Sequence, residues 1–179
     1  MLMHHAVAVN EFNGLPAHIL LIHLVVAGIP VAALLTVLSA VWPAARMRLG
    51  IITPIVALLA LISVPITENA GEWLQARTFH GYTDPLIVRH AEIGGELLPW
   101  AAGVFVLAVL AWGIPRYAER SRKPALESTG VRVAVGLLAV AIAGVATFQV
   151  YRIGDAGAKA AWSTNFCAKP YQGDTCPTG

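Results

Sequence analysis

The groups in this 179-residue chain that could bind a cofactor, a metal or a proton gather in one stretch, residues 66–98. The stretch holds acids, bases and histidines: Glu68, Glu72, Arg77, His80, Asp84, Arg89, His90, Glu92 and Glu96. Only 12% of the chain is charged, so this concentration of polar side chains is the main clue to function. A second source of ligands is the segment GLPAHILLIH, which carries His18 and His23.

The histidines suggest a haem. Five residues advance a helix by about 140°, so His18 and His23 point to different faces of one helix. His23 lies about as far past Pro16 as His90 lies past Pro85, and matching depth on two helices is what a bis-histidine haem b requires. The sequence therefore predicts His23 and His90 as the axial ligands of this haem. His18 is a further candidate, although a hydrogen-bonded structural role is its simpler interpretation. The alternative for the pair is a structural or proton-handling role.

The acids suggest a divalent metal as the other cofactor. Glu68, Glu72 and Glu96 could join a histidine from another helix in a site with oxygen and nitrogen ligands. The paired Glu-x-x-His signature of metal sites inside helix bundles is absent. The simpler interpretation is a set of structural ion pairs, whose expected members are Arg89, Glu92, Arg152 and Asp155.

The elements that must position these groups are membrane helices. The chain is 57% hydrophobic with a mean hydropathy of +0.68, which is too apolar for a soluble domain. Four apolar runs, at about 17–42, 51–67, 93–114 and 131–151, are each at or near the ~20 residues that cross a bilayer. The expected spans, which include the polar ends of the second and third helices, are about 17–42, 51–74, 85–114 and 131–151. Asp84 and Pro85 are typical of a helix start. The predicted fold is all-α, a four-helix transmembrane bundle spanning residues 17–162 with up-down-up-down topology.

The charges between the runs predict the orientation. Seven of the twelve Lys and Arg residues fall on one side: Arg46, Arg48, Arg116, Arg120, Arg122, Lys123 and Arg132. The positive-inside rule makes that side cytoplasmic, so both termini, residues 1–16 and 163–179, are expected outside. The N-terminal segment lacks the pattern of a removable signal peptide. In an oxidising compartment Cys167 and Cys176 of the tail are expected to form a disulfide, with a metal site as the less favoured alternative.

Four pieces of the chain resemble an uncharacterised family of small bacterial four-span membrane proteins with paired histidines on the first helix. The pieces are GLPAHILLIH, TENAGEWL, RHAEIGGE and VYRIGDAGAKAAW. The resemblance covers about Gly14 to Trp162 and implies the fold, the topology and a bacterial inner-membrane location, but no established activity. Many members carry a histidine after the last helix where this chain has Ile153 or Asp155, which counts against a haem ligand from that helix.

We therefore expect an integral membrane protein with an outward-facing His/Glu site, acting as a haem- or metal-binding subunit associated with redox chemistry. One alternative is a non-catalytic accessory subunit of a larger membrane complex, such as a respiratory one. Another is a protein that handles protons or cations through its acids. Nothing supports a hydrolase, because no nucleophile can be placed beside a base and an orienting group. An enzyme of another class is the less favoured alternative. The expected partners are the lipid bilayer and either a larger complex or a second copy of the chain, and not nucleic acid.

Overall fold

The computed structural model describes residues 10–78 and 80–163 of the chain. Its elements, in order, are β1 (Glu11–Phe12), β2 (Leu15–Pro16), α1 (Ala17–Val41), α2 (Pro43–Leu49), α3 (Ile52–Gln75), α4 (Pro85–Gly94), α5 (Leu97–Ser121), the 3-10 turn η1 (Pro124–Glu127) and α6 (Thr129–Trp162). The two short strands pair in antiparallel fashion just before α1. The all-helical fold predicted from the apolar runs is confirmed.

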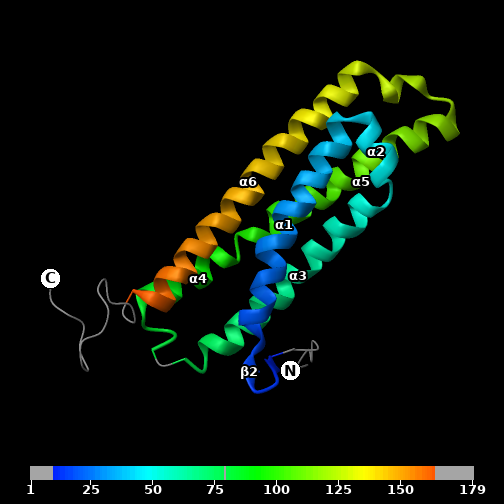
Figure 1. Cartoon of the computed structure of the whole chain (residues 1–179). Helices are drawn as coiled ribbons and strands as arrows, with labels where there is room; N and C mark the ends of the chain where they lie inside the picture. The colour runs from blue at the N-terminus through cyan, green and yellow to red at the C-terminus, as the bar shows by residue number, and fades with distance from the viewer. Residues whose placement is uncertain (1–9, 79, 164–179) are drawn as a thin grey trace, which may run out of the picture.

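Four segments of the described chain are long and apolar enough to cross a membrane. They are α1, α3, the segment Pro85–Ser121 that contains the consecutive helices α4 and α5, and α6. Figure 1 shows these helices side by side, with the start of α1, the end of α3, all of α4 and the end of α6 gathered at one end of the bundle. The short α2 and η1 lie at the opposite end. The chain therefore passes through the bundle four times, in alternating directions.

The helix ends differ in places from the apolar runs. Helix α6 continues past Tyr151 to Trp162, where it packs against α4. Asp155 and Lys159 pair one turn apart in this extension, at 2.7 Å. The predicted cap at Asp84 is confirmed, since its carboxylate accepts hydrogen bonds from the backbone of Leu86 and Ile87 at 2.8 and 3.4 Å. The backbone hydrogen bonds between residues four apart are interrupted between α4 and α5, where the N–H of Glu96 bonds to the carbonyl of Ile93, so α4 is a separate short helix.

The interior of the bundle is built mainly from small side chains. Helix α1 packs against α3, α5 and α6. The contacts use alanines with no more than a few per cent of their surface exposed: Ala32, Ala33, Ala57, Ala60, Ala101, Ala108, Ala139 and Ala146. Large apolar residues such as Leu24, Leu137 and Phe148 face outward. This inversion of size is typical of membrane helices, which approach closely through small residues and present large ones to lipid.

Candidate functional site

Two histidines from distant parts of the sequence meet at the end of the bundle that holds α4. His18 lies in the first turn of α1, and His90 lies in the middle of α4. The centroids of the two imidazole rings are 6.3 Å apart, and the ring planes cross at 75°. Both side chains are partly buried. We call His18 and His90 the imidazole pair.

The ring of His18 is fixed by α3. Its Nδ1 lies 3.0 Å from the carbonyl oxygen of Thr67. One turn further along α3, a Cβ on Gly71 would stand 3.0 Å from both Cε1 and Nδ1 of the imidazole. Only glycine at this position leaves room for the ring to reach the carbonyl.

The ring of His90 is fixed in the same way by α6. Its Nδ1 lies 3.1 Å from the carbonyl oxygen of Ile153. A Cβ on Gly157 would stand 3.0 Å from its Cε1 and 3.2 Å from its Nδ1. Each member of the imidazole pair thus uses one neighbouring helix, with a carbonyl at position i and a glycine at position i+4.

These hydrogen bonds decide which ring nitrogen is available for other chemistry. A carbonyl oxygen can only accept, so Nδ1 of each ring must carry the proton and donate it. In the neutral imidazole Nε2 then holds a free lone pair, which is the form of histidine that binds metals. Among residues 10–78 and 80–163 neither Nε2 has a hydrogen-bond partner.

The distance between the two ring centroids can be compared with that between two imidazoles bound to one metal ion. A metal–imidazole bond is about 2.0 Å, and bonds near 1.33 Å place each ring nitrogen about 1.15 Å from its centroid. Two imidazoles on opposite sides of one ion therefore have centroids about 6.3 Å apart. The observed distance is 6.3 Å.

His23 lies elsewhere. Its side chain is exposed on α1, and its Nδ1 lies 2.8 Å from the carbonyl of Ile19 in the same helix. The structure brings His18, and not His23, against His90. His23 and His90, the pair expected from matching chain depth, are therefore not the two imidazoles that lie side by side in the described structure.

The acids proposed as metal ligands do not assemble. Within the described part of the chain, no group of three or more His, Cys, Asp or Glu residues is placed to hold a bare metal ion. Glu72 is exposed, and Glu96 points toward α6. Glu68 is distinctive, because its Oε1 is buried and has no hydrogen-bond partner.

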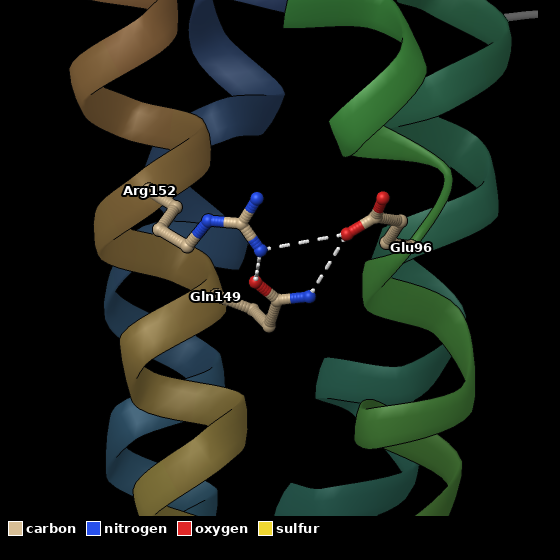
Figure 2. A network of polar contacts seen from close by, with 3 residues as sticks. All are labelled: Glu96, Gln149 and Arg152. Carbon is tan, nitrogen blue, oxygen red and sulfur yellow. Dashed lines mark hydrogen bonds and ion pairs between the residues drawn. The ribbon is translucent and has the colours of Figure 1, made fainter.

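The expected ion pairs are formed in part. Arg152 lies 3.5 Å from Glu96, and Gln149 joins them, donating to Glu96 at 3.2 Å and accepting from Arg152 at 2.6 Å (Figure 2). Asp155 pairs with Lys159 at 2.7 Å. Arg89 and Glu92, by contrast, form no ion pair with any residue that the structure describes. The predicted disulfide of Cys167 and Cys176 lies outside the described residues.

Sequence reasoning missed four residues of the site: Thr67, Gly71, Ile153 and Gly157. The two carbonyl acceptors leave no trace in the sequence, because any residue type supplies a carbonyl. The glycines do leave one, since a glycine inside a helix costs stability and usually has a packing reason.

Comparison of the chain with protein-family models, curated proteins and solved structures finds no match, so the resemblance to a four-span family stays a prediction.

Proposed function

We propose that this is a multi-pass membrane protein that binds one b-type haem between His18 and His90 and takes part in electron transfer. The observation that carries the proposal is the imidazole pair, with centroids 6.3 Å apart and each Nδ1 bonded to a backbone carbonyl of another helix. A haem iron needs only two protein ligands, so the lack of a larger ligand cluster among the described residues does not bear against it.

The surroundings of the two imidazole rings support a role as iron ligands. Histidines that bind metals usually donate their other N–H to a carbonyl or carboxylate, which fixes the tautomer and raises the basicity of the ligating nitrogen. Both rings have this arrangement before any ligand is added. On α4, nothing lies within 4 Å of a Cβ built on Gly94, one turn after His90.

The chemistry follows from the ligand count. A haem with histidine on both faces has no open coordination position, so it supplies electron transfer and not oxygen binding. The residues of this chain contribute by holding both ligands on separate helices and by fixing their protons on Nδ1. Because α1 and α4 are distant in sequence, binding would also cross-link the bundle.

We further propose the orientation expected from the charges. Arg46 and Arg48 of α2 and Arg116 of α5 lie toward the end opposite the imidazole pair. With that end in the cytoplasm of a bacterium, the haem lies near the outer surface of the inner membrane. Labelling of single cysteines placed at Met47 and Tyr82 with a membrane-impermeant reagent tests this, because only the Tyr82 position should react in intact cells.

Absorption spectroscopy tests the haem directly. The protein is produced with haem supplied, purified in detergent and measured oxidised and after reduction with dithionite. We expect a Soret band that shifts on reduction in the wild type and in His23→Ala, and its loss in His18→Ala and His90→Ala. His23→Ala is the matched control, since it removes an exposed imidazole of the same helix. A wild-type protein without a Soret band refutes the proposal.

Proton handling by Glu68 is a second candidate function, favoured by one observation. A buried carboxyl oxygen without a partner is costly, and ionisable residues at membrane depth usually serve a function. Proton flux into vesicles containing the protein tests this candidate, with Glu68→Gln compared with Glu72→Gln. Flux that does not depend on Glu68 rules it out.

A further inference from the structure

A cleft of about 420 Å³ lies between α4 and α6, apart from the imidazole pair. Three cationic side chains line it: Arg89 from α4, and Arg152 and Lys159 from α6. Its volume falls within the range of about 300–1,000 Å³ that is typical of small-molecule sites.

The cations of the cleft are not balanced by the acids around them. Asp155 is the one carboxylate in the lining, and it already pairs with Lys159 at 2.7 Å. Arg152 pairs with Glu96, with its Nη1 3.5 Å from Oε2, and Gln149 donates to the same oxygen. Arg89 forms no ion pair among the residues that the structure describes. The cleft thus keeps a net positive charge and an arginine whose donors are free for an anion.

The rest of the lining is apolar. Leu86 and the buried Ile93 of α4 contribute to the wall, and Tyr151 of α6 faces them. Lys159 and Tyr151 are eight residues apart on α6, so the lining covers about 12 Å along the helix axis. Lys159 lies toward the end of α6, whereas Ile93 and Tyr151 lie toward the bundle centre, where Arg152 follows Tyr151.

We propose that this cleft binds a phosphate group, with Arg89 and Lys159 contacting its oxygens. Arginine and lysine are the side chains that bind phosphate most often, through charge-assisted hydrogen bonds. Two sources offer this chemistry at the membrane surface: the head group of an anionic phospholipid, whose acyl chains would follow Ile93 and Tyr151, and free inorganic phosphate. The proposal does not depend on the haem, since neither histidine lines the cleft.

Native mass spectrometry of the delipidated, detergent-purified protein separates the two sources. The protein is titrated with phosphatidylglycerol, with phosphatidylcholine of the same acyl chains, and with inorganic phosphate. Selective retention of phosphatidylglycerol assigns a lipid site, and saturable binding of inorganic phosphate that competes with the lipid assigns a free-anion site. Equal retention of the two lipids together with no binding of phosphate overturns the proposal.

Variants locate the binding. Arg89→Gln and Lys159→Gln are each expected to weaken binding about tenfold, as for the loss of one charge-assisted contact. The control is Arg77→Gln, which removes a cation at the same end of the bundle that does not line the cleft and stacks on the Trp73 ring at 4.0 Å. A loss of binding in Arg77→Gln equal to that in Arg89→Gln also contradicts the assignment, because it indicates a general surface charge effect.

Discussion

Replacing Gly71 with alanine should separate haem binding from folding. The added Cβ would stand 3.0 Å from Cε1 and Nδ1 of His18, whereas carbon atoms in contact prefer about 3.5–4.0 Å. The imidazole must therefore withdraw by roughly 0.5 Å. It is held by a hydrogen bond of 3.0 Å to the carbonyl of Thr67, and this movement weakens that bond and turns the ring away from its ligating position.

The two energetic effects of this substitution oppose each other in the apoprotein. Losing the hydrogen bond costs about 1 kcal/mol, while alanine in place of glycine stabilises a helix by about 0.8–1.0 kcal/mol. The free energy of unfolding should change by less than about 1 kcal/mol as a result. Haem affinity should fall about 10- to 100-fold, the usual effect of removing a group that orients a metal ligand.

The assay is a haem titration of the apoprotein followed by absorbance, with thermal unfolding of the same samples. Gly157→Ala should behave like Gly71→Ala, because its Cβ would meet the ring of His90 at 3.0 Å. Gly154→Ala is the control on the same helix as Gly157, since nothing lies within 4 Å of its Cβ. Unchanged haem affinity in Gly71→Ala, or an equal loss in Gly154→Ala, would refute the role given to these glycines.

Three further predictions follow from single contacts. His18→Met should keep the haem and raise its reduction potential in a redox titration, because a thioether ligand favours the reduced iron; an unchanged potential means that residue 18 is not a ligand. Gln149→Leu should destabilise the protein by about 1–3 kcal/mol in thermal unfolding, because Gln149 is 7% exposed and bonds both Glu96 and Arg152; an unchanged melting temperature contradicts this. Glu68→Leu should raise the melting temperature, since it removes a buried carboxyl oxygen that has no partner; a lower melting temperature would indicate that Glu68 is bound to something in the membrane.

The fold was predictable because the bilayer imposes simple rules on a sequence. Apolar runs near the length needed to cross it had to be helices, since no other open structure satisfies its backbone there. The cap formed by Asp84 and Pro85 was also readable, because it depends only on neighbouring residues. The extension of α6 to Trp162 was not, since helix ends beyond the lipid are set by local pairs and packing and not by hydropathy.

The choice between His18 and His23 could not be made by counting residues from a proline. The number of residues after a proline does not give a residue's position along the bundle axis here. Helix α4 is a separate short helix, and its packing against α6 sets its position. Helical phase was the better signal. His18 falls on the same face as Val25, Ile29 and Ala32, the buried stripe of α1, at spacings of seven, four and three residues, and His23 does not.

We propose that His18 and His90 are the two protein ligands of one haem. The most direct measurement is the ratio of haem to protein in samples saturated with haem and freed of excess. We predict one haem per chain in the wild type and in His23→Ala, and none tightly bound in His18→Ala or His90→Ala. Haem retained in His18→Ala but lost in His23→Ala would contradict the account and return the site to the other histidine of α1.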